Sequence, residues 1–433
     1  MPGVLEGIKV VDVAQVAAVP MCARHLADFG ASVIHVEHPV VGDMWRRQVG
    51  GSPAAPSGVP YNWENFNRNK RGMTLDLAHD AGRQVLCDLI AGSDVFVTNL
   101  RLWEQDKFRL GYEEMRKLNP RLIYGSVTGF GKKGPDRNTP AYDTTAYWGR
   151  AGISHTLTTL GMTGPASRPA FGDVVAGLGL AFGVMTALYH RERTGVGQEV
   201  DISLFHTGIY QSSFDASVAA AIGPAYDEWK QNPPIEEDEV ARQKRLDAMQ
   251  RVQEAVMGLI EIYRGYSPNP LAGVYLTSDG RRMIFNAMNS DRYWSVFCRA
   301  IDRPDLVDDP RFNSADARSE NRLVLGPVLR EAFLGKTLAE WRPLLNELPF
   351  APAQTLAEAV EDPQALANDV FVPFDHPVYG PTRVISSPIN LSQTPATIRT
   401  PAPEFSQHTE AILLELGRTW DDIARLKEQG VIA

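Results

Sequence analysis

Cysteine is scarce in this chain of 433 residues, which has three: Cys22, Cys87 and Cys298. They are far apart, odd in number, and belong to no CxxC pair or Cys/His cluster. A disulfide framework or a structural zinc site is therefore not expected. We predict no metal site, and the reduced thiols suggest a cytoplasmic protein.

The common nucleotide and hydrolase motifs are also missing. The segment after the first expected strand reads VVDVAQVAAVP and lacks GxGxxG, which argues against a nicotinamide or flavin dinucleotide site. No GxxxxGK[ST], GxSxG or HExxH motif occurs anywhere. A dehydrogenase, a P-loop nucleotidase, a serine hydrolase of the usual type and a zinc protease are all disfavoured.

Positive charge is in deficit, since 43 Lys and Arg face 52 Asp and Glu, for a net charge of −9. We expect neither nucleic acid nor an anionic membrane surface as a partner. No basic segment precedes an apolar run at the start of the chain, which argues against a secretory signal. The stretch Val174–Tyr189 is apolar but holds three glycines, and it is short for a membrane span, so we predict a buried helix.

The remaining composition, 44% hydrophobic and 22% charged, is typical of a globular protein, and the length suggests two domains. Residues Gly7–Val13 form a short β-branched segment bounded by glycine, as in a buried parallel strand. A helix is expected over Pro20–Phe29 and a second strand up to Glu37. The pattern recurs with a helix at Asp80–Ala91 and strands at Asp94–Thr98 and Arg121–Ser126. The first 130 residues therefore predict a doubly wound α/β domain.

A long helix is expected from Asp173 to Arg193, ended by Gly195 and Gly197, with EVDISLFH as a following strand. We favour close helix packing as the reason for Gly177, Gly179 and Gly183.

Composition changes near Ala225, so we assign residues 1–225 to the first part of a large domain, 226–345 to a small domain with linker helices, and 346–433 to a return to the large domain. An acidic run at 236–239 predicts a solvated helix start, and Val240–Arg264 predicts a helix. The segment Gly273–Asn286 predicts a hairpin that turns at Ser278-Asp279-Gly280. The C-terminal segment predicts a helix near Thr355–Asn368, a hairpin over Val370–Ser386 and a last helix over His408–Leu416.

Four segments, read together, resemble the class III CoA-transferase family, which includes formyl-CoA:oxalate and carnitine-type CoA-transferases. They are Leu5–Asp43, Asn67–Leu77, Ile123–Asp143 and, most specifically, GDVVAGLGLAFGVMTALYHRERTGVGQEVDISL at Gly172–Leu204. Weaker similarity continues almost to the end of the chain. The resemblance implies a CoA-transferase that needs no permanently bound cofactor and takes coenzyme A as a substrate thioester, with an acyl-CoA and a small carboxylic acid as partners.

The resemblance also implies a fold: an α/β, Rossmann-like large domain built from both chain ends, with a smaller α+β domain inserted. Two such chains are expected to interlock as a homodimer. The nucleophile is expected to be the aspartate that follows glycine at the start of the long helix, here Asp173.

The chemistry of CoA transfer agrees with an aspartate. Exchange between two acids is nearly isoenergetic, so a carboxylate that attacks a thioester and is itself activated suffices. A helix N-terminus favours the ionised form, so we expect Asp173 to be ionised near neutrality. An aspartate before an apolar helix is also a common N-cap, and Asp173 could have both roles.

Tyr142 separates two activities within the resemblance. The α-methylacyl-CoA racemases, which share the fold, carry a histidine before an aspartate here as an acid/base group, whereas this chain has Tyr142-Asp143. A phenol with a pKa of about 10 is a poor proton shuttle near pH 7. A transferase is favoured, and an acyl-CoA racemase or isomerase remains the alternative.

The segment match also implies which residues bind the substrate and CoA. They are Gln15, Ala17, Ala18, His38, Leu75 to Ala78, Asn99, Leu100, Arg101, Arg109 and Tyr142. The chain departs from the formyl-transferase pattern in having His38 for an arginine and Pro140 for a lysine, and Lys132 or Lys133 could replace the lost charge. Gln15 stands for a histidine, and residues 266–270 replace a glycine-rich loop that covers the site in those relatives.

Overall fold

The computed structural model describes residues 3–46, 58–157, 167–222 and 269–433. The chain divides into two compact units, one comprising residues 1–158, 162–218 and 363–433 and the other residues 159–161 and 219–362. The helix expected at 240–264, the acidic run at 236–239 and most of the segment at 266–270 lie outside the described residues.

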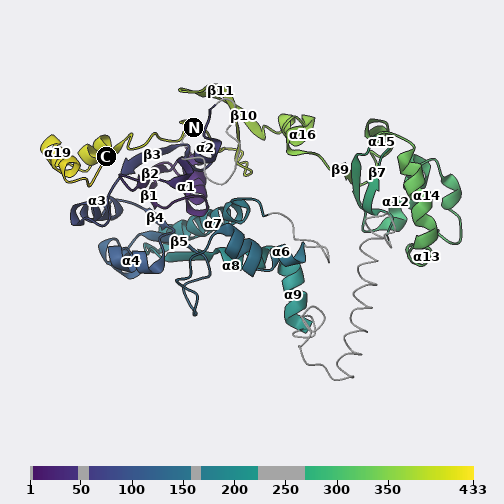
Figure 1. Ribbon diagram of the computed structural model, residues 1–433, viewed down its shortest axis with the longest axis horizontal. Helices are drawn as coiled ribbons and strands as arrows, with labels where there is room; N and C mark the ends of the chain where they lie inside the picture. Colours follow the sequence, from purple (N-terminus) through teal and green to yellow (C-terminus); the bar gives the residue numbers. More distant parts are fainter. Residues whose placement is uncertain (1–2, 47–57, 158–166, 223–268) are drawn as a thin grey trace. The chain divides into compact units, whose positions relative to one another are not determined.

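A six-stranded parallel sheet forms the centre of the first unit, with strand order β3-β2-β1-β4-β5-β6 (Figure 1). Its strands are β1 (Lys9–Val13), β2 (Ser32–Glu37), β3 (Lys70–Thr74), β4 (Val95–Thr98), β5 (Ile123–Thr128) and β6 (Glu199–Ser203). The order reverses between β1 and β4, as in a doubly wound fold. The predicted α/β class of this region is confirmed.

Successive residues of a strand point to opposite faces of the sheet. Both sets are apolar here, so helices cover both faces. On one face, Val10 of β1 packs in a buried cluster with residues of α1 (Ala18–Asp28) and α7 (Phe171–Thr194). On the other face, Val11 packs with residues of α3 (Asp80–Ala91), α5 (Tyr112–Leu118), α18 (Thr409–Glu415) and α19 (Trp420–Glu428). The C-terminal helices therefore complete the core of the first unit.

The first unit also contains shorter elements. They are η1 (Met44–Arg46), α2 (Tyr61–Asn67), α4 (Leu102–Phe108), a π-helical segment η2 (Thr144–Arg150), α6 (Ile153–Thr156), α8 (Leu204–Gln211), α17 (Pro363–Ala367) and the antiparallel pair β10 (Phe371–His376) and β11 (Gly380–Ile385). Helix α9 (Ser213–Ile222) begins in the first unit, and its residues 219–222 belong to the second.

Most expected elements are present, and four details differ. Strand β3 was not predicted, because its sequence KRGMT lacks a β-branched run. The strand expected to reach His206 ends at Ser203, whose side chain accepts a hydrogen bond from the His206 N–H and so starts α8. The helix expected at 355–368 is two short helices, and α19 follows the helix expected to be the last.

Helix α7 is the one described helix that is long and apolar enough to cross a membrane. Its residues Leu180 and Val184 are fully buried against the sheet, and a Cβ added to Gly177 would lie 2.5 Å from the Ala18 carbonyl oxygen of α1. The close packing predicted at Gly177 is confirmed, whereas the predicted burial of the helix holds for one side only, since Phe182 and Tyr189 are exposed in the single chain.

The second unit has its own sheet and core. Strands β7 (Ala272–Leu276), β8 (Arg282–Asn286) and β9 (Phe350–Pro352) are antiparallel, and the predicted hairpin turn contains Gly280 at φ 72°. The helices of this unit are α12 (Ser290–Ala300), η3 (Pro304–Leu306), α13 (Ala315–Glu320), α14 (Arg322–Leu334), α15 (Leu338–Leu344) and α16 (Leu356–Val360). The core is aromatic, with Phe285, Phe297 and Phe333 in mutual contact.

Candidate active site

A cavity of ≈ 240 Å³ opens in the first unit where the strand order reverses. It lies beyond the carboxyl ends of β1 and β4, which is where ligands bind in doubly wound sheets. Eight of the residues predicted from the sequence line it: Gln15, Ala17, Ala18, Asn99, Leu100, Arg101, Tyr142 and Asp173. Residues as far apart in the chain as Gln15 and Asp173 therefore meet at one site.

Asp173 lies in the first turn of α7, with 9% of its surface exposed. The preceding Gly172 is required by crowding, since a Cβ there would overlap the Tyr147 ring and the Asp143 carboxylate. The start of α7 thus sits directly against η2, and the Asp173 side chain is held at the wall of the cavity.

Asp143 fills the capping role considered for Asp173. The N-cap position of α7 is Ala170, which has no side-chain hydrogen bond, whereas Asp143 Oδ1 accepts a hydrogen bond of 3.0 Å from the Gly172 N–H. Burial raises the pKa of Asp143 to about 6, opposed by the backbone N–H groups that it faces. Asp143 was not among the predicted site residues, although it directly follows Tyr142 in the motif.

Burial governs the protonation of Asp173. Desolvation, followed by repulsion from Asp143, raises the pKa of Asp173 from 3.8 to about 7. Burial therefore opposes the ionisation near neutrality that we expected from the helix N-terminus, and Asp173 holds a proton more readily than an ordinary aspartate. The helix dipole is outweighed because the carboxylate is removed from water and has a second carboxylate near it.

Asn99 holds the loop that follows β1. Its side-chain oxygen accepts a hydrogen bond of 3.1 Å from the Gln15 N–H, and its amide nitrogen donates one of 2.8 Å to the Gln15 carbonyl. Both residues belong to loops at the switch point of the sheet. Gln15 itself is exposed and lines the cavity.

Two aspects of the site bear on ligand choice. Tyr142 is 60% exposed at the cavity, so it is not a core aromatic residue. Arg137 and Arg101 supply positive charge to the lining. Lys132, considered as a replacement for the lost family lysine, instead forms ion pairs with Glu199 and Asp201, because β6 brings these carboxylates beside it.

A second cavity, of ≈ 300 Å³, shares Gln15, Leu100 and Glu104 with the first. It is lined by the predicted residues His38 and Leu75 to Ala78. Arg109 lines neither cavity; it is exposed and ends α4 in the left-handed conformation, at φ 55°. Within the described part of the chain, no group of three or more His, Cys, Asp or Glu residues could hold a metal ion.

Comparisons with known proteins agree on one family. The profile of CoA-transferase family III matches residues 5–234 and 248–409. The chain is 32% identical to (R)-2-hydroxy-4-methylpentanoate CoA-transferase of Clostridioides difficile, over 99% of each chain. It is 29% identical to cinnamoyl-CoA:phenyllactate CoA-transferase of Clostridium sporogenes, over 98% of this chain and 96% of the other. A CAIB/BAIF family protein from Brucella suis has a similar structure, with a TM-score of 0.73, 27% identity and coverage of 96% and 100%.

Proposed function

This chain belongs to CoA-transferase family III and is an acyl-CoA:carboxylate CoA-transferase, and on that premise we propose that Asp173 carries the CoA between the two acids as an aspartyl-CoA thioester. One observation supports this assignment above the others: a buried carboxylate at the start of α7 faces a cavity at the switch point of the sheet.

The proposed cycle has two symmetrical halves. In the first, an Asp173 oxygen attacks the carbonyl carbon of the acyl-CoA, the C–S bond breaks, and the CoA thiolate leaves, so that the acyl group and Asp173 form a mixed anhydride. The thiolate then attacks the aspartyl carbonyl carbon, which releases the donor acid as a carboxylate and forms aspartyl-CoA. The acceptor carboxylate repeats these steps in reverse, and Asp173 is regenerated without net change in charge.

The environment of Asp173 fits this role. A carboxylate with a pKa near 7 is more basic, and therefore a stronger nucleophile, than one with an ordinary pKa of 3.8. Its ionised form is still accessible near neutral pH. Asp143, which accepts the Gly172 N–H, supports the position of Asp173 rather than reacting itself.

We assign the two adjoining cavities to the acyl-CoA. Together they are lined by the CoA-binding residues that the sequence implied, apart from Arg109. Tyr142 is proposed to lie near the thiol, because it shares the cavity with Asp173. Arg101 and Arg137 in the first cavity and Lys107 in the second are cationic lining residues that can attract phosphate groups.

A 2-hydroxy acid is our proposed acceptor. Two relatives that match nearly the whole chain are named for 2-hydroxy-4-methylpentanoate and for phenyllactate, both 2-hydroxy acids with an apolar substituent. Apolar lining residues are present here as well: Met44, Val127 and Leu204. The polar carboxylate would meet Asp173, and the apolar substituent would lie against this wall.

Trapping of the intermediate tests the proposal. The protein is incubated with a panel of thioesters that includes acetyl-CoA, succinyl-CoA and a 2-hydroxyacyl-CoA, then treated with hydroxylamine, and its peptides are analysed by mass spectrometry. We expect a hydroxamate at Asp173, and none in Asp173→Ala. Asp143→Asn is the control for chemistry at the neighbouring carboxylate, and its label should remain on Asp173.

The same experiment separates the racemase alternative. An unmodified Asp173, together with exchange of the α-proton of the acyl group for solvent deuterium, would refute the transferase mechanism and favour an isomerase. Tyr142 in place of a histidine is the sequence feature against that outcome.

We further infer an interlocked homodimer in the cytoplasm, with the two units as the large and the inserted small domain. Large side chains on α7, α8 and α9 are strongly exposed in the single chain: Phe182 (75%), Tyr189 (65%), Tyr210 (76%) and Phe214 (84%). A partner chain that covers them would remove apolar surface from water. Light scattering should give twice the chain mass of 47.7 kDa, and a monomer would refute the dimer.

A further inference from the structure

Val16 has a backbone conformation that its side chain disfavours. Its φ is 70°, in the left-handed region, where a β-branched residue is a true outlier. Val16 lies in the loop after β1 and lines the cavity between Gln15 and Ala17. Such strain persists only where surrounding contacts impose it, and it is concentrated at functional sites.

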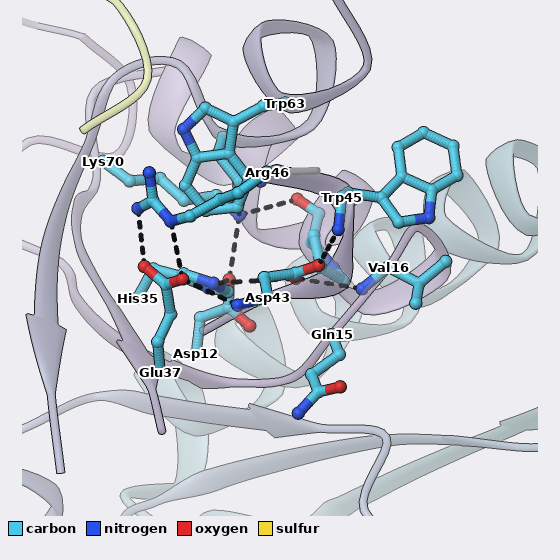
Figure 2. Close-up of polar contacts among 12 residues, drawn as sticks. Asp12, Gln15, Val16, His35, Glu37, Asp43, Trp45, Arg46, Trp63 and Lys70 are labelled. Atoms are coloured by element: carbon cyan, nitrogen blue, oxygen red, sulfur yellow. Dashed lines mark hydrogen bonds and ion pairs between the residues drawn. The ribbon is translucent and has the colours of Figure 1, made fainter. Parts of the chain in front are cut away.

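Asp43 is hydrogen-bonded to the backbone of Val16. Its Oδ2 accepts a hydrogen bond of 3.0 Å from the Val16 N–H, and its Oδ1 accepts one of 2.8 Å from the Trp45 N–H. Only 1% of the Asp43 surface is exposed. The carboxylate therefore uses both oxygens to join the β1–α1 loop to η1 (Figure 2).

A network of largely buried polar side chains holds Asp43 in place. Its own N–H donates a hydrogen bond of 2.8 Å to Glu37 Oε2, and Arg46 pairs with the same glutamate through two hydrogen bonds of 2.6 and 2.7 Å. His35 Nε2 lies 4.0 Å from Asp43 Oδ2. Figure 2 shows these side chains gathered around the carboxylate.

The network continues into the sheet. His35 Nδ1 and Lys70 Nζ each lie 2.8 Å from Asp12 Oδ2, and all three side chains are fully buried. Buried ion pairs are weak contributors to stability, because desolvation offsets their attraction. What this arrangement provides is a fixed position for Asp43, and through it for the backbone of Val16.

We propose that Asp43 is a positioning residue for CoA transfer, holding Val16 in the left-handed conformation so that Gln15 and Ala17 keep their places in the lining of the cavity that also contains Asp173. The Asn99 bridge to the Gln15 backbone holds the loop from its other side. This inference rests on the proposed function, because positioning has meaning only for a reaction at Asp173.

A double-mutant cycle between positions 43 and 16 tests the inference. Asp43→Asn keeps the size of the side chain but offers one acceptor oxygen to two N–H donors, so the loop should lose its fixed geometry. Val16→Gly makes a positive φ easy to adopt. We measure kcat and KM for the thioesters of the trapping panel in the wild type, both single variants and the double variant.

The expected result is coupling between the two sites. Misplacement of a cavity wall by about 1 Å lowers kcat on the order of 100-fold, so Asp43→Asn should reduce kcat by that order while KM changes less. In the Val16→Gly background, Asp43→Asn should reduce kcat roughly tenfold or less, because glycine adopts a positive φ without needing the hydrogen bond to Asp43. Equal losses in both backgrounds would overturn the inference.

A second comparison does not require the Asp43 variant to fold. Val16→Ala and Val16→Gly both remove the side chain beyond Cβ and differ mainly in tolerance of a positive φ. Val16→Gly should have the higher melting temperature and the higher kcat. Equal values for the two variants would show that position 16 carries no strain and would overturn the inference.

Asp28→Asn provides the matched control. Asp28 is also 1% exposed and pairs with Arg68 at 2.8 Å, but it lines neither cavity. Asp28→Asn should lower the melting temperature and leave kcat of the folded enzyme unchanged. A fall in kcat equal to that of Asp43→Asn would count against a specific role of Asp43.

If the wild type transfers CoA with no thioester of the panel, the proposed function fails, and the inference with it. If the wild type turns over and Asp43→Asn has the same kcat, the proposed function stands and only the inference about Asp43 is overturned.

Discussion

Replacing Asp173 by asparagine should stabilise the protein above pH 7 while abolishing CoA transfer. The carboxylate is 9% exposed, and burial together with Asp143 raises its pKa from 3.8 to about 7. The charged form is therefore disfavoured in the folded protein relative to the unfolded chain. Asparagine has nearly the same size and cannot ionise, so it removes this cost.

The magnitude follows from the linkage between protonation and folding. Between about pH 4 and pH 7 the folded wild type binds a proton at Asp173 that the unfolded chain has released, so its free energy of unfolding falls as the pH rises through this window. The two pKa values differ by about three pH units, and each unit corresponds to about 1.4 kcal/mol, which gives about 4 kcal/mol in total. A shift of about 2–4 °C per kcal/mol holds for domains of 150–250 residues, and the first unit is larger, so the melting temperature at pH 8 should rise by about 8 °C or less.

The assay is equilibrium unfolding of the wild type and Asp173→Asn at several pH values from 4 to 8. The difference in unfolding free energy should be smallest at pH 4, grow up to about pH 7 and then level off. Asp422→Asn is a useful contrast, because hydrogen bonds from Thr419 lower the pKa of this half-buried aspartate, so the wild type should lose that stabilisation as the pH falls. A constant difference between the wild type and Asp173→Asn across the range would refute the assignment of a desolvated carboxylate.

Three further predictions concern rate, packing and charge. Transfer from acyl-CoA should slow as the pH falls through about 7, because attack requires the Asp173 carboxylate; a rate independent of pH between 5 and 8 would contradict this. Gly177→Ala should lower the free energy of unfolding by about 1–3 kcal/mol, since its Cβ would lie 2.5 Å from the Ala18 carbonyl oxygen; urea unfolding measures the loss. Arg137→Ala should raise KM for acyl-CoA about tenfold through loss of a charged contact. Lys132→Ala should leave KM unchanged, because Lys132 lines neither cavity and contacts Glu199, Asp201 and the Tyr124 ring.

Local patterns predicted most of the α/β framework. The βαβ repeats of the first 130 residues, the long helix that ends at Gly195 and the two hairpins all follow from hydrophobic period, glycine position and turn residues, which act over a few neighbours. Strand β3 was not predicted, because its residues form a strand by pairing with β2 along their whole length rather than through their own propensity.

The candidate nucleophile, Asp173, was predictable because it stands in a long and specific motif. The protonation state of Asp173, the capping role of Asp143 and the clamp from Asp43 to Val16 were not, since each depends on the removal of water and on contacts between residues far apart in the chain. Lys132 illustrates the same limit, because its partners on β6 follow it by 67 and 69 residues.

The sequence by itself determined the family, the parallel α/β class and the residue types available for catalysis, because short-range pattern and motif encode them. Only the tertiary structure decided how those residues act. Parallel strands bring their carboxyl ends to one edge, and so place Gln15, Asn99 and Asp173 around a single cavity. The electrostatics of that cavity, and the strain in its wall, come from burial, which no linear pattern specifies.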